Sequence, residues 1–204
     1  MFKLGRWTTL LFGLALIAVL ASCTGKGTVM ISFATANNES AWFPIDVAVW
    51  MAHERYPGSI EYSYTVNDAT ADLQASLIDV NTGQSSNCRA VRLDSYIVTW
   101  NNSLARIPTR HGALDVTLPA DPNSSKPAKF TILVMPAVDK ETLQVLSNLR
   151  GDPSPGDPNT FVGELITTAT ITFSGSDLAT GKEVEASLDL TAVFADFLDP
   201  NSYH

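Results

Sequence analysis

Apolar and polar residues alternate with period two along most of the chain after Thr28, which is the pattern of β-strands that bury one face. The clearest example is a hairpin near the end of the chain, formed by residues 165–173 and 183–191. One face of each segment is apolar, while the other carries threonines in the first segment and mostly acidic side chains in the second. The pattern predicts that Ile171 and Leu188 are buried.

On the opposite face of the same hairpin, Glu183 and Glu185 are expected to be exposed. The other predicted strands lie between turns rich in proline, glycine and polar residues. They are residues 28–35, 44–51, 60–66, 71–80, 89–100, 113–118 and 129–135. The last of these segments is largely apolar, which predicts burial on both faces.

Two places depart from simple alternation. In residues 89–100, Val91 and Leu93 share one face, but Tyr96, Val98 and Trp100 fall on the other. In the last strand, adjacent apolar residues at positions 193 and 194 predict a slip in register or a β-bulge.

Residues 139–149 break the β pattern and predict one short amphipathic helix. Asp139 can cap its start, and leucines recur within it at three-residue spacing. About nine short strands with a single helix predict an all-β fold, an antiparallel β-sandwich. An eight-stranded closed barrel is the alternative architecture.

The chain begins with a different kind of segment. Lys3 and Arg6 precede an apolar run over residues 10–21, which is the layout of an export signal. This run is shorter than the roughly 20 residues that cross a bilayer. The sequence that follows it, Leu20-Ala21-Ser22-Cys23, resembles the lipobox of bacterial lipoproteins. The alternative is an ordinary cleaved signal followed by a chance cysteine.

The lipobox resemblance implies a signal peptide over residues 1–22 and a lipidated tether over residues 23–27. Residues 28–204 then form the one β-sandwich domain that the strand pattern predicts. In such lipoproteins the cysteine thiol receives a diacylglyceryl group, cleavage occurs just before it, and the new N-terminus is usually acylated. Cys23 would therefore bind membrane lipid through its acyl chains. Thr24, in the place of an aspartate, favours sorting to the outer membrane.

Charge narrows the range of partners. Residues 23–204 carry 11 basic and 21 acidic residues, a net charge of −10. An acidic surface repels phosphate backbones, so nucleic acid is not expected as a partner. It also disfavours docking on anionic lipid by charge, so the lipid anchor has to supply the membrane affinity.

The chain has two cysteines, and lipidation of Cys23 leaves Cys88 without a partner for a disulfide. We interpret Cys88 as a small apolar residue at the start of a strand rather than a reactive thiol. Acidic loops provide weak calcium candidates, which are Asp152, Asp157, Asp196 and Asp199. Because Asp-Pro pairs also form turns, and because no ligand-spaced motif is present, we expect neither a metal nor another cofactor.

Catalytic motifs are missing from the sequence. The histidines His53, His111 and His204 are isolated, and no GxSxG, phosphate-binding loop or paired-cysteine motif occurs. We therefore predict that the protein is not an enzyme. An envelope enzyme remains an alternative if a histidine and a carboxylate share a cleft.

Two segments resemble a known group of proteins. The strand Val91–Trp100 and the region Ile166–Asp199, which ends in Phe194-Ala195-Asp196-Phe197-Leu198-Asp199, are similar to uncharacterised bacterial lipoproteins with an immunoglobulin-like or fibronectin-type-III-like domain. The resemblance implies an immunoglobulin-like β-sandwich in the cell envelope. It brings no catalytic residues.

Three hypotheses follow for the function. The first is a non-catalytic binding or structural module that contacts an envelope protein. The second is a carbohydrate- or ligand-binding module that uses the aromatic residues of the first half, above all Trp42 and Trp50. Exposure of both tryptophans side by side would favour this second hypothesis, and burial of both would rule it out. Because Trp and Tyr are buried on average, the sequence favours a place in the core for these aromatic residues. The third is the envelope enzyme.

The lipobox yields a direct prediction. Cys23→Ala should release the protein from the membrane fraction or leave it uncleaved with its signal attached, because the acyl chains have no attachment point. Fractionation and the mass of the N-terminal peptide measure both outcomes. A mature Cys23→Ala protein that still sediments with membranes would contradict the lipobox interpretation.

Overall fold

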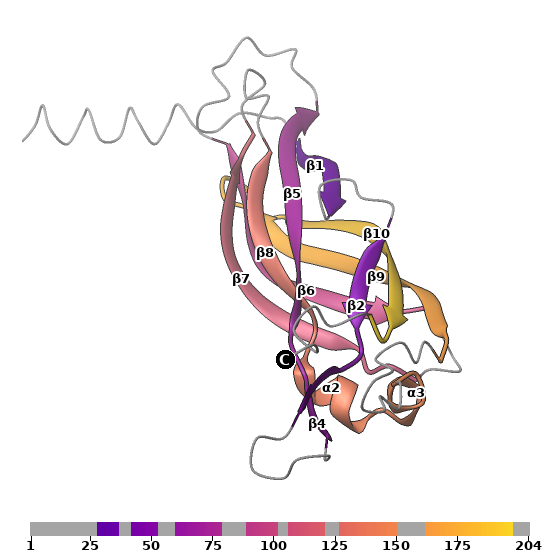
Figure 1. The fold of residues 1–204 in the computed structure, drawn as a ribbon. Coiled ribbons are helices and arrows are strands. Elements are labelled where there is room, and N and C mark those ends of the chain that lie inside the picture. Colours follow the sequence, from indigo (N-terminus) through magenta and orange to yellow (C-terminus); the bar gives the residue numbers. More distant parts are fainter. Residues whose placement is uncertain are drawn as a thin grey trace, which may run out of the picture.

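The computed structural model describes residues 28–36, 42–52, 60–78, 89–101, 106–120, 127–150 and 162–197. Within these ranges the chain is all-β, as the alternating pattern predicts, with three sheets and two short helices. The two larger sheets face one another, and the larger of them curls around the other (Figure 1). They enclose one core, to which Leu73 and Ile132 contribute from one sheet and Leu93, Phe173 and Phe194 from the other.

The first sheet has the strand order β1-β5-β8 and is antiparallel throughout. Its strands are β1 (Thr28–Ala36), β5 (Asn67–Ile78) and β8 (Ala128–Met135). Thr28 lies opposite Ile78, the last residue of β5, whereas Asn67 lies opposite Met135. The first described residue and the end of β8 therefore lie at opposite ends of this sheet.

The second sheet has the strand order β2-β10-β9-β6-β7. Its strands are β2 (Phe43–Asp46), β6 (Ala90–Trp100), β7 (Arg110–Pro119), β9 (Glu164–Asp177) and β10 (Glu183–Ala195). β9 and β10 form the predicted hairpin, in which Ile171 lies opposite Leu188. Both of these residues are buried, and Glu183 and Glu185 are exposed, which confirms the expected faces.

The expectation that all strands pair antiparallel is wrong at one edge. β2 runs parallel to β10, with Phe43 opposite Ala192. The reason is the path of the chain, because β1 belongs to the first sheet and β2 to the second. A chain that changes sheets between two strands makes no hairpin with itself.

Residues 44–51, predicted as one strand, form parts of two strands. β2 ends at Asp46, and β3 (Val49–Ala52) pairs with β4 (Ile60–Ser63) in a separate two-stranded sheet. Val47 and Ala48 are both buried, which breaks the alternation between them. The N–H of Val47 donates to the carbonyl of Ala195 at 3.0 Å, so the chain remains attached to β10 where it leaves the sheet.

A β-bulge accounts for the change of phase in β6. The register shifts between Leu93 and Ser95 in the pairings of β6 with both of its neighbours. Relative to β9 the extra residue is Asp94, whereas relative to β7 the additional residue lies in β7. The shift brings Leu93 and Tyr96 to the same inner face, and both are buried.

The slip predicted in the last strand is wrong. Val193 and Phe194 stay in continuous register with β9. Val193 points outward but is buried between Pro44 of β2 and Ile166 of β9, which are its partners on either side. Cover from these neighbours therefore explains the two adjacent apolar residues.

The single predicted helix is two helices, α2 (Ala137–Thr142) and α3 (Gln144–Ser147), separated by Leu143 with extended backbone. A three-residue spacing of leucines does not match the 3.6-residue period of a straight α-helix, and only the middle leucine of the three is fully buried. Asp139 caps neither helix, because Pro136 occupies the N-cap of α2.

The prediction that residues 129–135 are buried on both faces is also wrong, since Leu133 of β8 is exposed.

Tyr96 ties the two large sheets together. Its hydroxyl accepts a hydrogen bond from the N–H of Leu133 in β8 at 3.0 Å and lies 3.3 Å from the carbonyl oxygen of the same residue. Gly112 lies opposite Tyr96 in β7. A Cβ atom at position 112 would lie 2.0 Å from a carbon of the Tyr96 ring. Only glycine leaves room for this ring.

We predict that Gly112→Ala destabilises the protein by about 1–3 kcal/mol, the usual cost of forcing an extra carbon into a packed core. Urea unfolding of a soluble version beginning at Thr24 measures the change. Ala113→Ser is the matched control, because Ala113 is the exposed neighbour in the same strand. Equal stabilities of the two variants would show that the Tyr96 ring is free to move away.

Candidate functional site

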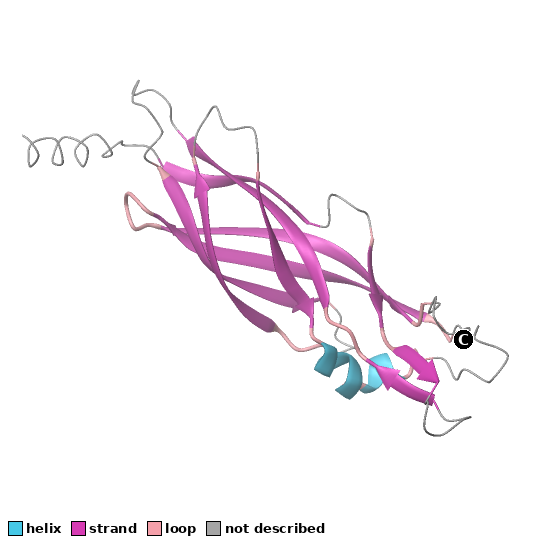
Figure 2. Cartoon of the chain, turned by 60° about the vertical axis from the view of Figure 1, so that its left-hand side comes forward, coloured by secondary structure: helices cyan, strands magenta, loops and turns pink. Residues whose placement is uncertain are grey.

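The strands of both large sheets run between two ends of the molecule (Figure 2). The Thr28 end contains Thr28, the ends of β5 and β9 and the starts of β6 and β10. The helical end contains α2, α3 and the β3–β4 sheet (Figure 1).

An ion pair attaches α2 to the second sheet. The Nε of Arg110, the first residue of β7, donates to Oδ2 of Asp139 at 2.9 Å, and an Nη2–Oδ1 bond completes a bidentate contact. Asp139 is buried, whereas the side chain of Arg110 is partly exposed. Fork-shaped pairing of this kind fixes the relative orientation of the two groups as well as their distance.

Lys140, the next residue of α2, is completely buried. Its Nζ lies 3.5 Å from the hydroxyl of Thr65, just before β5. Burial lowers the pKa of Lys140 to about 8, against the attraction of the Asp46 carboxylate, which raises it. Oδ1 of Asp46 also accepts a hydrogen bond from the N–H of Phe197 at 3.3 Å, so the lysine lies among the ends of several strands.

Arg150 holds the far end of α2. Its guanidinium lies over the rings of Tyr62 and Tyr64, at 5.6 and 4.9 Å from their centroids. Its Nη2 donates to the carbonyl oxygens of Lys140 and Glu141, each at 3.1 Å. Carbonyls in the last turn of a helix have no partner within the helix, so Arg150 satisfies two of them while it packs on the residues of β4 and the segment after it.

Exposed apolar side chains are more numerous toward the helical end than toward the Thr28 end. Nine large apolar residues are exposed among the described ones, and seven of them lie toward the helical end. These seven are Trp42, Val66, Leu133, Val138, Val162, Ile166 and Phe197. Met30 and Leu178 lie toward the Thr28 end. Leu133 lies on the outer face of the first sheet and Ile166 on the outer face of the second, so the seven residues share an end of the molecule and not a single face.

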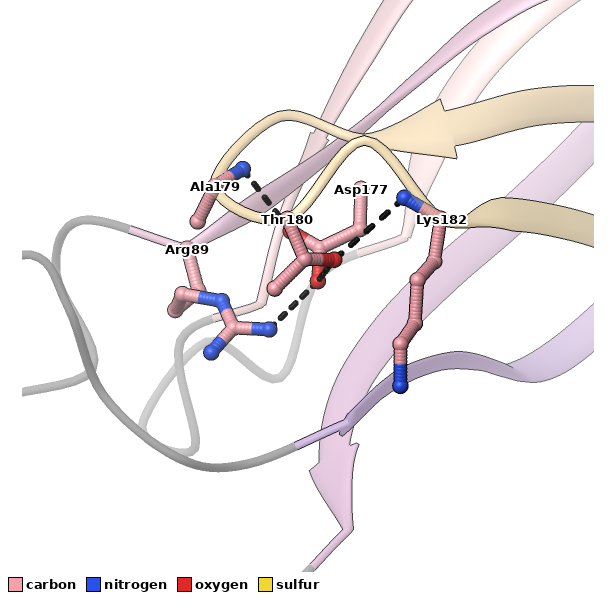
Figure 3. Close-up of polar contacts among 5 residues, drawn as sticks. All are labelled: Arg89, Asp177, Ala179, Thr180 and Lys182. Atoms are coloured by element: carbon pink, nitrogen blue, oxygen red, sulfur yellow. Dashed lines mark hydrogen bonds and ion pairs between the residues drawn. The ribbon is translucent and has the colours of Figure 1, made fainter.

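The Thr28 end has a buried ion pair of its own (Figure 3). Nη2 of Arg89, just before β6, pairs with Oδ2 of Asp177 at the end of β9, and both side chains are almost inaccessible. Burial opposes ionisation of Asp177, but bonds from the Ala179 N–H, Arg89 and the Thr180 hydroxyl lower its pKa below the usual value. The two polar clusters thus lie at opposite ends of the molecule.

Several predicted site residues lie outside the described residues. They are Cys23, Cys88, Asp152, Asp157, Asp199, His53 and His204. Asp196 is partly buried just after β10, and His111 is exposed on β7. Among the residues that the structure describes, no three histidine, cysteine or acidic side chains come together as a metal site, and no helix is long and apolar enough to span a membrane.

The aromatic residues divide between surface and core. Trp42 is 57% exposed. Trp50 pairs through its backbone with Tyr62 in the β3–β4 sheet, and its side chain is not among those that the structure describes. Trp100 packs against Phe194 with ring centroids 5.3 Å apart, and Tyr96 belongs to the core. The expected place in the core is therefore wrong for Trp42, and side-by-side exposure of Trp42 and Trp50 is not tested.

Sequence reasoning missed the charged contacts of the helical end. Arg110 and Asp139 lie 29 positions apart, and no local pattern connects them. Lys140 continues the three-residue spacing of Leu143, Leu146 and Leu149. Because the helix breaks at Leu143, that spacing does not define one buried face and could not predict the burial of the lysine.

No protein-family model matches the chain, and no curated protein matches it in sequence.

Lys140 generates a prediction on pH. Between about pH 8 and 10.5 the unfolded chain keeps the lysine proton while the folded protein releases it, so the free energy of unfolding rises with pH through this window. The difference between the parent and Lys140→Met should grow in favour of the parent by up to about 3 kcal/mol.

Urea unfolding at several pH values measures this difference, and Lys182→Met, at an exposed lysine, provides the background curve. Parallel curves for the two variants would show that burial of Lys140 does not affect its protonation.

Proposed function

We propose that this chain is a lipid-anchored, non-catalytic lipoprotein of the bacterial cell envelope that binds a partner protein through its helical end. One observation carries the proposal. Most of the exposed apolar side chains lie toward the end of the molecule opposite Thr28, the residue that follows the lipidation motif and tether. A protein anchored near Thr28 presents these side chains away from the membrane.

The lengths of the segments support this orientation. The five residue steps from Cys23 to Thr28 span at most about 18 Å. The 14 residues of β9 extend over about 45 Å. The anchor therefore holds the Thr28 end near the lipid, and the helical end stands well beyond it. Thr24 after the lipidated cysteine favours the outer membrane as the site of anchoring.

For the fold we propose an immunoglobulin-like β-sandwich over residues 28–204. Strand order supports this assignment. If β1, β5 and β8 are taken as strands A, B and E, and β10, β9 and β6 as G, F and C, the sheets have the orders A-B-E and G-F-C of immunoglobulin domains. β7 extends the second sheet beyond β6, in the position of a C′ strand. Such domains are common scaffolds for protein contacts.

A non-catalytic role fits the distribution of the charged groups. Lys140 and Asp177, the described groups with a clearly shifted pKa, lie at opposite ends of the molecule and do not form one site. Each is held by contacts that join strands or helices, which is the behaviour of structural ion pairs. An envelope enzyme would instead need its acid and its base within one cleft.

The exposure of Trp42 supports a second candidate function. An exposed indole provides a flat apolar surface with one hydrogen-bond donor, which suits the faces of sugar rings as well as protein side chains. Trp42 precedes β2 at the edge of the second sheet. Carbohydrate or ligand binding through Trp42, with Trp50, is therefore the alternative to a protein partner.

The protein-partner proposal predicts site-dependent crosslinking in cells. A photoreactive amino acid at Val138 or Ile166 should give a discrete protein adduct, because both side chains are exposed toward the helical end. The same group at Ser187, on the outer face of β10, is the control. Adducts of equal yield at Ser187, or adducts that carry only glycan, would reject a protein contact at the helical end.

A further inference from the structure

We propose that the turn between β9 and β10 is a membrane contact, in which Leu178 enters the interface of the bilayer that holds Cys23. This inference rests on the lipid anchoring proposed above. It adds a second point of attachment, and with it a fixed orientation of the domain on its membrane.

The turn lies at the end of the molecule that the anchor reaches. Asp177 pairs with Val91 at the start of β6, and the N–H of Leu178 donates to the carbonyl of Ala90 at 2.9 Å. Thr28 lies at the same end, opposite the last residue of β5. Since the tether from Cys23 spans at most about 18 Å, Thr28 stays within that distance of the lipid, and the turn lies at the same end of the molecule.

Leu178 is unusual for its place. It is 55% exposed in a tight turn, a position where small and polar residues are the rule. Among the nine exposed large apolar residues that the structure describes, only Met30 and Leu178 lie toward the Thr28 end. Met30 is the third residue of β1, close to the tether.

The turn is built to hold its shape (Figure 3). The carboxylate of Asp177 accepts bonds from Arg89, from the N–H of Ala179 at 2.9 Å and from the hydroxyl of Thr180 at 2.8 Å. The N–H of Gly181 donates to the carbonyl of Asp177 at 2.7 Å, and Gly181 has a φ of +68°, which favours glycine. These bonds fix the backbone on both sides of Leu178, so its side chain is presented outward.

One leucine is too little to bind a membrane, but it is enough to orient a protein that is already anchored. The acyl chains keep the turn at a high effective concentration near the bilayer, so insertion becomes an intramolecular step. The contact is apolar and does not depend on anionic lipid, which agrees with the acidic character of the chain. Removal of the Leu178 side chain should shift the ratio of inserted to free orientations about tenfold.

The test uses the full lipidated chain with Cys88→Ser, bound to vesicles of phosphatidylethanolamine and phosphatidylglycerol. An environment-sensitive fluorophore is attached at Ala179→Cys, or at Val138→Cys at the helical end as the control. We expect a blue-shifted emission at position 179 and strong quenching by nitroxide-labelled lipids, and neither effect at position 138. Leu178→Ser in the protein labelled at position 179 should remove most of the quenching.

Flotation of the vesicles separates the two proposals. If the chain does not float with the vesicles, the lipid anchoring fails and this inference fails with it. If it floats but position 179 is quenched no more than position 138, anchoring stands and the membrane contact is overturned. Unchanged quenching in Leu178→Ser, with the melting temperature preserved, would also overturn it, because the leucine would then have no part in the contact.

Discussion

The contact between the Tyr96 ring and the backbone of Gly112 sets the spacing of the whole domain. The ring fills the space left by the missing side chain in β7, and its hydroxyl reaches the peptide group of Leu133 in the opposite sheet. β8 is an edge strand of its sheet, so Tyr96 occupies hydrogen-bonding groups that would otherwise lack a strand partner. The bulge at Asp94 serves the same contact, because without this residue, which is extra relative to β9, Tyr96 would point to solvent.

Period-two alternation was sufficient to predict an all-β chain and the β9–β10 hairpin, because burial of one face depends only on which residues are apolar. The same signal failed where a neighbour from elsewhere in the sequence covers a side chain. Val193 is buried on the outer face by Pro44, which lies about 150 positions away in the chain. The phase change in β6 was visible in the sequence, but its meaning depended on which face its two partner strands present.

The helical end was beyond prediction for a related reason. Its polar groups come from the ends of several strands and from α2, and each contact joins residues distant in sequence. The burial of Lys140 is costly by itself, and it is tolerated because Asp46 and Thr65 lie near the amine. These contacts attach α2 to the ends of the strands, so its position does not depend on the helix itself being long or strongly capped.

The passage of the chain from β1 in one sheet to β2 in the other has a mechanical consequence. Tension applied through Thr28 along the length of the molecule acts parallel to β1, so the bonds between β1 and β5 are loaded in shear and have to break together. Behind them, the parallel pairing of β2 with β10 resists the same pull from the second sheet. A domain tethered at this point withstands force better than one pulled from a hairpin, whose bonds open one after another.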